Sequence, residues 1–516
     1  MKQIDVSSRS CTVLVDGGAD YYAPKPYALT LNGAPVDAAD RAVVTLFGLW
    51  PDTEYTLVRT RPDEPEEVLA FRTRPEVCTF NVRRFGAVGD GAADDTAALQ
   101  GAILCCPDGG RVLIPAGQYW TGPLFLKSHI TLELAAGAEL RLITDPQRFP
   151  VLPGMTRTTD EQGEVLLGSW EGNPLDMYAA AITGIGVEDV RIIGQGIVDG
   201  CASRDNWWKQ AKRAVGPYRP RLFYLRDCRH VTVQGLTFRN SPAWNLHPTF
   251  SEDLSFLNVR VEAPADSPNT DGFDPESCRH IRLMGTVFSV GDDCIALKAG
   301  KIYMGETYHT PCEDIEIAWC LMLDGHGGVT VGSEMAGGVR DVRVHHCRMV
   351  GNDRGLRIKT RRGRGRYGVI DRIRFEDVRM ERVKTPLVVN AMYFCDPDGR
   401  TATVQSRDPK PVDDTTPTVG SITYERVTAT VCAGCAAYIL GLPERPVQEI
   451  RLSDCRFAFA DDPQPMTPAM AAGVPLCAGE GVIAQYVDKL VLHHVTIEGL
   501  RGERMTLEQV GSVEDE

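Results

Sequence analysis

The sequence of 516 residues predicts an all-β chain, made of a small N-terminal β-sandwich followed by a long right-handed parallel β-helix. Residues 1–76 alternate apolar and polar side chains between turn signals, which is typical of short antiparallel strands. Beyond them one strand pattern recurs along most of the chain, and no helical pattern lies between its clearest copies. The 50 glycines and 33 prolines also favour a turn-rich β architecture over a helical bundle.

The N-terminal stretch is expected to form a module of its own. Its alternation is visible in "CTVLV", "YALTLNG", "AVVTLFGL", "YTLVRT" and "LAFRTR". The segment "LWPDTEYTLVR" at 49–59 resembles an element of fibronectin type III modules, which implies that Tyr55 is a tyrosine-corner residue. The alternative is a plain hairpin with a half-buried Tyr55. We therefore divide the chain into a fibronectin type III-like module at 1–76 and a β-helix domain at 77–516.

The β-helix prediction depends on an internal repeat. The segments "CRHVTVQGLTF" at 228, "CRHIRLMGTVF" at 278, "CEDIEIAWCLM" at 312 and "VRDVRVHHCRM" at 339 alternate apolar residues at period two, and similar strands begin near 187, 252, 369, 447 and 487. Units of about 24 to 34 residues with only strands and turns cannot bury a face alone, so they must stack into a solenoid. A propeller would need a more constant repeat length.

One helix is expected ahead of the repeats. "DDTAALQGAILCC" predicts a helix with Asp95 or Thr96 as its N-cap residue. Such a helix would cover the open N-terminal end of the β-helix and protect its edge strands.

Composition excludes several classes of function. The net charge of −14 argues against a general nucleic-acid binder. No apolar run reaches transmembrane length, and the N-terminus lacks a signal-peptide core, so we expect no membrane contact and a cytoplasmic location, or a secreted protein if a leader was removed. The 16 cysteines fit small buried residues, the lone "CAGC" at 432–435 indicates no metal site, and "GRGRYG" at 363–368 lacks the strand–helix–strand unit of a dinucleotide site. We expect no cofactor and no metal.

The repeat places several polar residues in one column. In a β-helix, residues at equal offsets in consecutive coils stack about 4.8 Å apart. Asp292 follows Ile281 at the same spacing at which His326 follows Ile315, so the two are expected to stack. Comparable segments of the flanking coils carry Asp271 on one side and Arg357 with Lys359 on the other.

This column suits the cleavage of a sugar bond. Glycoside hydrolysis needs one protonated carboxyl to donate to the leaving oxygen and one ionised carboxylate to activate water or to attack. Crowding Asp292 and Asp293 beside Asp271 raises the pKa of one of them by like-charge repulsion, which keeps an acid protonated.

Four motifs also resemble a known family. "NTDGFDP" at 269, "GDDC" at 291, "GHGG" followed by "VTVGSE" at 325, and "RIK" at 357 resemble, in order and spacing, the signature segments of the polygalacturonases of glycoside hydrolase family 28. The resemblance covers roughly residues 78–500. It implies that Asp292 is the general acid, that Asp271 and Asp293 hold and deprotonate a water with inversion, and that His326 tunes the acid.

The same resemblance implies the substrate contacts. Arg357 and Lys359 would bind the carboxylate of galacturonate, and Asn269, Tyr393 and His247 would contact the sugar chain. The expected partner is a galacturonate-containing oligosaccharide or a pectin fragment. The basic run at 354–366 fits such a polyanion better than a nucleic acid, because the whole chain is acidic.

Three alternatives stay open: a hydrolase of rhamnogalacturonan or another pectic backbone, a pectate lyase with a Ca²⁺ site and a catalytic base, and an inactive carbohydrate-binding β-helix. The "GHGG" and "RIK" pairing is a hydrolase feature and disfavours a lyase. We expect an exo-acting enzyme, in which the N-terminal module and the insertions at 145–180 and 396–418 close one end of the cleft.

Overall fold

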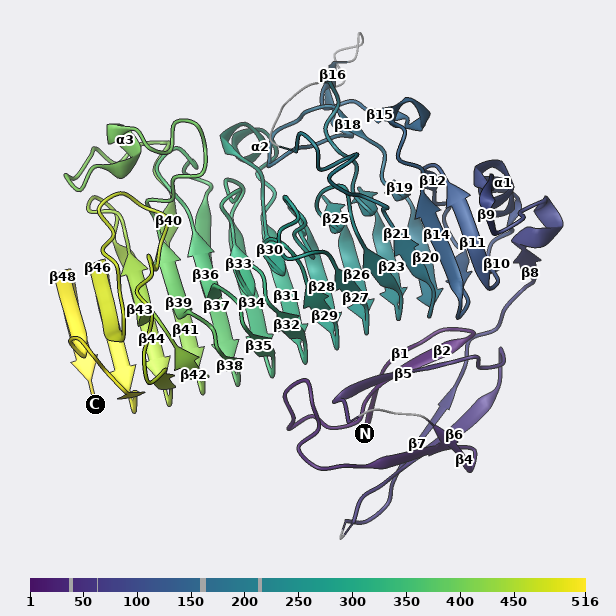
Figure 1. The fold of residues 1–516 in the computed structure, drawn as a ribbon, viewed down its shortest axis with the longest axis horizontal. Helices are drawn as coiled ribbons and strands as arrows, with labels where there is room; N and C mark the ends of the chain where they lie inside the picture. The colour runs from purple at the N-terminus through teal and green to yellow at the C-terminus, as the bar shows by residue number, and fades with distance from the viewer. Residues whose placement is uncertain (37–39, 63, 158–163, 212–215) are drawn as a thin grey trace.

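The computed structural model contains a long stack of parallel β-strands with a smaller antiparallel module beneath it (Figure 1). It describes residues 1–36, 40–62, 64–157, 164–211 and 216–516. Part of the predicted insertion at 145–180, residues 158–163, therefore lies outside the described residues. Within the described ranges, no helix has the length and apolarity that crossing a bilayer requires.

The parallel strands form three ladders, each adding about one strand per coil. The first contains β8 (Thr79–Asn81), β10 (Arg111–Ile114), β13 (Thr131–Leu134), β20 (Glu188–Gly194), β23 (Arg229–Gln234), β26 (Glu252–Leu257), β28 (Arg279–Met284), β31 (Cys312–Ala318), β34 (Val339–His345), β37 (Val369–Glu376), β40 (Thr418–Val419), β41 (Ser421–Glu425), β44 (Val447–Ser453), β46 (Glu480–His493) and β48 (Met505–Asp515). The second contains β9 (Asp90–Asp94), β11 (Gly117–Thr121), β14 (Ala138–Leu142), β21 (Ile197–Asp199), β24 (Thr237–Arg239), β27 (Arg260–Glu262), β29 (Val287–Ser289), β32 (Leu321–Leu323), β35 (Arg348–Val350), β38 (Arg379–Glu381), β42 (Thr428–Cys432), β45 (Arg456–Phe459) and β47 (Thr496–Glu498). The third contains β12 (Leu124–Phe125), β19 (Ile182–Ile185), β22 (Phe223–Arg226), β25 (Leu246–Thr249), β30 (Ile295–Leu297), β33 (Val329–Val331), β36 (Arg354–Lys359), β39 (Thr385–Asn390) and β43 (Cys435–Leu440), which pairs with the first half of β46.

The register confirms the repeat. Leu254 pairs with Ile281, Ile281 with Ile315, and Ile315 with Val342, and all four side chains are buried. Because the apolar residue of each strand points inward at the same place, the coils share one continuous core. The cysteines are free, and most are buried, as the sequence predicted.

Short elements complete the domain. The predicted helix α1 (Thr96–Cys105) has Asp95 at its N-cap position, and its buried Leu99, Ala102 and Ile103 pack on the first coils. It lies at the N-terminal end of the stack (Figure 1). The other short elements are η1 (Val82–Phe85), η2 (Pro146–Arg148), α2 (Ile302–Tyr308), α3 (Ala402–Gln405), and two small hairpins, β15 (Val151–Leu152) with β18 (Met177–Tyr178) and β16 (Thr156–Arg157) with β17 (Glu164–Val165).

The N-terminal module is a β-sandwich. One sheet has the order β1 (Lys2–Val6), β2 (Ser10–Leu14), β5 (Val43–Phe47), and the other has the order β4 (Ala34–Val36), β3 (Ala28–Leu31), β6 (Glu54–Thr60), β7 (Glu67–Arg72). Side chains of both sheets share one core. The hydroxyl of Tyr55 accepts a hydrogen bond from the backbone N–H of Trp50 at 2.8 Å, the contact that defines a tyrosine corner. The tyrosine-corner prediction for Tyr55 is therefore confirmed, and the fibronectin type III-like assignment of the module stays a prediction.

The module packs against the coils of the first ladder. Ala42 and Val43 contact an apolar group that includes Leu257, Met284 and Trp319. Asp5 pairs with Arg191 at 2.7 Å. This face is well away from the third ladder, which carries the candidate site.

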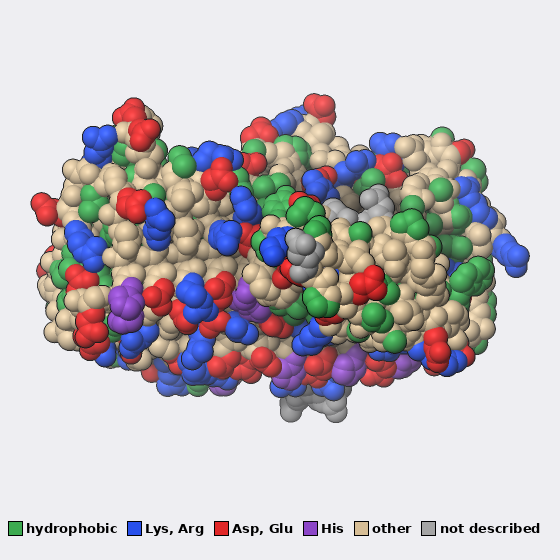
Figure 2. All heavy atoms as spheres, turned by 90° about the horizontal axis from the view of Figure 1, so that it is seen from below, with side chains coloured by type: hydrophobic (Ala, Val, Ile, Leu, Met, Phe, Trp, Pro, Cys, Tyr) green, Lys and Arg blue, Asp and Glu red, His purple; other side chains and the backbone are tan. Residues whose placement is uncertain are grey.

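A row of alternating histidines and aspartates runs beside the module. Asp253 Oδ2 lies 3.4 Å from His230 Nδ1, its Oδ1 lies 3.3 Å from His280 Nδ1, and His280 Nε2 lies 3.7 Å from Asp314. We call these four residues the histidine ladder. They line a hollow of about 940 Å³ between the module and the β-helix. Figure 2, seen from below, shows histidines among acidic and basic side chains over this face.

Candidate active site

A second, smaller hollow lies over the third ladder and holds most of the residues predicted from sequence. Its volume is about 710 Å³. Its walls include eight of the nine predicted site residues: Asn269, Asp271, Asp292, Asp293, His326, Arg357, Lys359 and Tyr393. We call it the catalytic cavity.

The acidic residues of the cavity come from neighbouring coils of the β-helix. Ile295 pairs with Val329, which sets His326 beside Asp292, and the His326 N–H donates to the Asp292 carbonyl at 3.1 Å. The N–H of Gly272 donates to the carbonyl of Asp293, which brings Asp271 alongside. The stacking of Asp292 and His326 that equal offsets predicted is confirmed. One carboxylate oxygen from each of Asp271, Asp292 and Asp293 lies within 4.8 Å of the other two.

Asp293 is held ionised by two cations. Arg357 Nη1 donates to its Oδ1 at 3.2 Å, and Lys359 Nζ donates to its Oδ2 at 2.7 Å. Burial alone would raise the pKa of Asp293, but Lys359 and then Arg357 outweigh it and hold that pKa well below its usual range. With both oxygens committed to cations, Asp293 is poorly placed to bind a metal ion.

The pKa of Asp292 is shifted in the opposite direction to that of Asp293. Burial raises the pKa of its carboxyl, and the charge of Asp293 beside it raises that pKa further. Its Oδ1 accepts a hydrogen bond from the Asp293 backbone N–H at 3.0 Å. Neighbouring carboxyls with pKa values pushed apart are the arrangement that acid–base catalysis requires.

Asp271 is buried more deeply and touches a lysine that the sequence analysis missed. Burial, followed by the charges of Asp292 and Asp274, raises the pKa of Asp271 well above its usual range. Lys298 Nζ lies 3.9 Å from Asp271, 3.5 Å from Asp274 and 3.1 Å from Glu334. Lys298 follows Ile281 at the same spacing at which Lys359 follows Val342. The rule of equal offsets that stacks aspartate and histidine could therefore have found it.

His326 stands at the rim. Its side chain is 55% exposed, and Nδ1 lies 3.9 Å from Asp353. The position near Asp292 fits the predicted tuning of the acid, and the exposure leaves the imidazole accessible to a substrate.

The predicted substrate contacts divide into two groups around the acids. On one side, Tyr393 faces both cations, with its ring centroid 5.5 Å from the Arg357 guanidinium carbon and 5.2 Å from Lys359 Nζ. On the other side, Asn269 accepts a hydrogen bond from Arg219 at 2.8 Å through its side-chain oxygen.

An aromatic wall that the sequence analysis did not single out lies near Asn269. Trp170 stacks on Tyr218 with ring centroids 4.6 Å apart, and Trp244 lies 4.8 Å edge-on to His247. Trp170, Tyr218 and Trp244 all line the catalytic cavity. Sugar rings pack well on such apolar faces.

The prediction for His247 is wrong. Its side chain is fully buried beneath Trp244, where Arg221 donates to Nδ1 at 3.3 Å and Glu276 contacts Nε2 at 3.0 Å. Burial lowers the pKa of His247 to about 4, so this imidazole is neutral. It supports the cavity floor and cannot touch a sugar.

Both insertions that were predicted to close one end of the cleft contribute to the walls of the catalytic cavity. Trp170, Glu171, Asn173 and Leu175 from the first insertion line the cavity, and Pro397 of the second does so as well. Among the described residues of the N-terminal module, none lines it. The module packs on the first ladder instead, so its part in closing the cleft is wrong.

Comparisons with known proteins agree with this geometry. Residues 129–467 match the family described as "Glycosyl hydrolases family 28". A protein of Vitis vinifera named "Probable polygalacturonase" is 31% identical over 387 residues, which cover 73% of each chain.

Two solved structures share the fold. One is titled as a Yersinia enterocolitica family 28 exopolygalacturonase, with a TM-score of 0.76, 19% identity, and coverage of 100% of this chain and 98% of the other. The second is titled as a hyperthermoactive exopolygalacturonase from Thermotoga maritima, with a TM-score of 0.65, 25% identity, and coverage of 83% and 91%.

Proposed function

The chain belongs to the family 28 glycosyl hydrolases, the polygalacturonase family, and from this premise we propose that it removes galacturonate units from the end of α-1,4-linked galacturonate oligosaccharides. The observation that carries the proposal is the pair Asp292 and Asp293. Two adjacent carboxyls with oppositely shifted pKa values share one cavity with buried cations.

In this proposal Asp292 supplies the proton. Its raised pKa keeps it protonated at a pH where an ordinary aspartate is ionised, so it donates to the glycosidic oxygen as the bond breaks. Asp293, held ionised by Lys359 and Arg357, activates the attacking water, and Asp271, whose pKa is raised, assists it only in its ionised form. Each acid or base contributes on the order of 10²- to 10⁴-fold to the rate.

The buried cations suit an acidic sugar. Lys359 and Arg357 face the cavity beside Tyr393, and Lys298 lines the same cavity. A galacturonate carboxylate that reaches them would share their hydrogen bonds with Asp293. Each charge-assisted bond is worth about 1.5–3 kcal/mol, which explains the choice of an anionic sugar over a neutral one.

The separation of the carboxyl groups is the usual structural guide to whether a glycosidase inverts or retains the anomeric configuration. Carboxyls of inverting glycosidases usually lie about 6.5–9.5 Å apart, whereas retaining enzymes hold them about 5–5.5 Å apart. The 4.8 Å limit here joins the closest oxygens of three carboxylates, two of which can hold one water between them. This separation is shorter than both ranges, so we propose inversion from the resemblance of the four motifs to the polygalacturonases, and proton NMR of the first-formed anomer tests it.

Exo action is supported by the place of the two insertions in the cavity wall. The first insertion places Trp170 and Glu171 in the wall, and the second places Pro397 there. The two exopolygalacturonase titles among the similar structures agree with this geometry.

A product time course on oligogalacturonides of defined length tests the function. We expect mono- or digalacturonate from the first time point, with no rise in the absorbance of unsaturated ends. A rise in absorbance would show a lyase. Intermediate lengths appearing first would contradict exo action, and no product would favour another pectic backbone or a binding role.

A further inference from the structure

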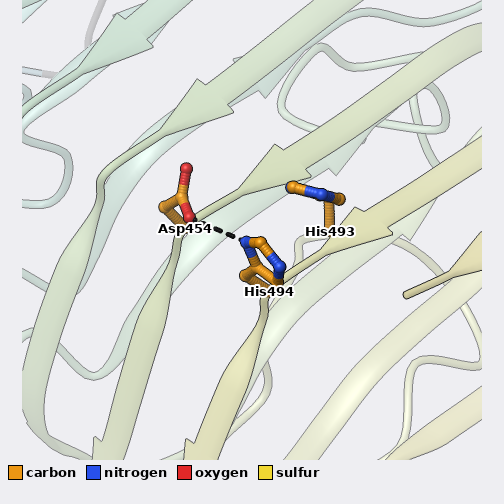
Figure 3. A group of neighbouring side chains, drawn as sticks. All are labelled: Asp454, His493 and His494. Carbon is orange, nitrogen blue, oxygen red and sulfur yellow. Dashed lines mark hydrogen bonds and ion pairs between the residues drawn. The ribbon is translucent and has the colours of Figure 1, made fainter.

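A polar cluster far from the catalytic cavity lies on the last coils of the β-helix. Asp454 follows β44, His493 is the final residue of β46, and His494 comes next. One ligand atom from each side chain lies within 4.8 Å of the other two. Figure 3 shows both imidazoles and the carboxylate on the same side of the ribbon.

Backbone geometry explains how neighbouring histidines come together. Successive side chains on a strand point to opposite faces. His494 breaks this alternation because its φ is 53°, in the left-handed region, and its ring lies 3.8 Å from that of His493 between centroids. Asp454 lies one coil earlier, at the equivalent position, because Ser453 pairs with His493. Its φ is also positive, at 52°. Its Oδ1 lies 3.2 Å from His494 Nδ1.

Two imidazoles and one carboxylate form a donor set for a transition metal. We propose that Asp454, His493 and His494 bind a divalent ion of the Zn²⁺ class. Imidazole nitrogen suits Zn²⁺, Cu²⁺ and Ni²⁺, whereas Mg²⁺ and Ca²⁺ prefer all-oxygen sites. The side chains of His494 and Asp454 are 66% and 53% exposed, so an ion reaches them from solvent and keeps water on its remaining positions.

Glu516 lies next to one of these three residues. Leu492 pairs with Asp515, which sets Glu516 beside His493, and the two residues line a hollow of about 240 Å³. Arg451 also lines it, but that side chain is engaged by Glu449 at 2.9 Å. Neither Asp454 nor His494 lines this hollow, so the proposed ligand set consists of the three residues alone, with water on the remaining positions.

The chain contains a natural comparison at the same repeat position. "VRVHHCRM" and "LVLHHVTI" both place a His-His pair at the end of a first-ladder strand. In the earlier pair the two Nδ1 atoms lie 2.9 Å apart, and His345 is buried and paired with Glu316 at 3.1 Å. Among the described residues, the groups of three metal-ligand atoms within this range do not include that pair.

The bound ion would link two of the last coils and so stabilise the C-terminal end of the β-helix. Asp454 belongs to the turn between β44 and β45, whereas both histidines belong to the last full coil. Beyond them only β48 adds to this ladder, and most of its side chains are exposed. An ion that binds the folded chain and not the unfolded chain raises the melting temperature, and the rise grows with the logarithm of the ion concentration once that concentration exceeds Kd.

A zinc titration of the full chain without an affinity tag tests the proposal. Zn²⁺ is titrated against a chromophoric chelator for the wild type, His494→Ala, Asp454→Asn and the control His346→Ala. We expect about one equivalent of bound Zn²⁺ in the wild type and in His346→Ala. In the two site variants the affinity should fall by more than the roughly 10- to 100-fold that loss of an outer-shell partner costs.

Thermal melts with and without Zn²⁺ provide the second readout. The zinc-dependent rise in melting temperature should appear in the wild type and in His346→Ala and vanish in His494→Ala and Asp454→Asn. Unchanged affinity in both site variants would overturn the proposal, as would the absence of binding to the wild type. Zinc lost instead in Asp292→Asn would place the ion in the catalytic cavity and would also overturn it.

Discussion

Two rows of charged side chains follow the same stacking rule on opposite faces of one β-helix, yet only one of them is equipped for catalysis. In the histidine ladder, His280 is 48% exposed and Asp314 is 73% exposed. In the catalytic cavity, Asp293 is 2% exposed and Lys359 is 8% exposed. Water screens the ladder, whereas burial turns the cavity contacts into large pKa shifts. The stacking of coils places polar side chains next to one another on both faces. Only in the catalytic cavity are they also buried, and this burial shifts their pKa values.

The largest effect is expected at the general acid. Asp292→Asn removes the proton donor while keeping the side-chain shape, so kcat should fall by about 10²- to 10⁴-fold. Initial rates on trigalacturonate measure it. His280→Gln in the ladder is the matched control and should keep wild-type kcat. Unchanged turnover in Asp292→Asn would remove catalysis from this cavity.

A smaller loss is expected at the cation that holds Asp293. Lys359→Gln removes the 2.7 Å contact and a binding partner for the substrate carboxylate. Losing a charge-assisted bond of about 1.5–3 kcal/mol corresponds to roughly a ten- to hundredfold drop in kcat/KM. We expect kcat to fall and KM to rise together. If KM alone rises, Lys359 binds substrate without assisting Asp293.

A substitution in the aromatic wall of the cavity should have a more modest effect. Trp170→Ala removes an aromatic wall and stacking worth about 0.5–1.5 kcal/mol, which is roughly a two- to tenfold rise in KM for short oligosaccharides. Opening this wall should also let longer chains bind across the site. Viscosity loss and reducing ends, recorded together on polygalacturonate, should show more internal cleavage than in the wild type. An unaltered ratio would mean that other residues set exo action.

The smallest effect is expected in the ladder. His280→Ala removes contacts to Asp253 and Asp314 at 3.3 and 3.7 Å, both open to solvent. Exposed pairs of this kind contribute about 0–1 kcal/mol to the free energy of unfolding. Denaturant unfolding should therefore shift little, and kcat should stay unchanged. A large loss of activity would mean that the ladder communicates with the cavity.

The sequence predicted those features that the period-two alternation of apolar and polar residues determines. It predicted the coils through Leu254, Ile281, Ile315 and Val342, and equal offsets predicted that Asp292 and His326 stack. It also placed Tyr55 correctly, because a tyrosine corner is a local contact.

The sequence could not show what lies over an outward position. His247 occupies such a position on β25, but Arg221 and Trp244 enclose it, so its accessibility depends on segments distant in sequence. The prediction that the N-terminal module closes the cleft was wrong for the same reason. Its docking on Leu257 and Met284 depends on matching surfaces that the alternation of apolar and polar residues does not specify.

The pH dependence of kcat at saturating oligogalacturonide tests the central claim most directly. Asp292 acts protonated and its pKa is raised, so kcat should fall as pH rises through that value, above the usual aspartate range of about 3.5 ± 1.2. Asp293 acts ionised and its pKa is lowered, so the acidic limb should lie below that range if Asp293 is the base. If Asp271 must also be ionised, the acidic limb moves up, because its pKa is raised. A plateau bounded by an alkaline fall is the predicted result, and a rate that keeps rising with pH, as removal of a proton by a base would give, would contradict the account.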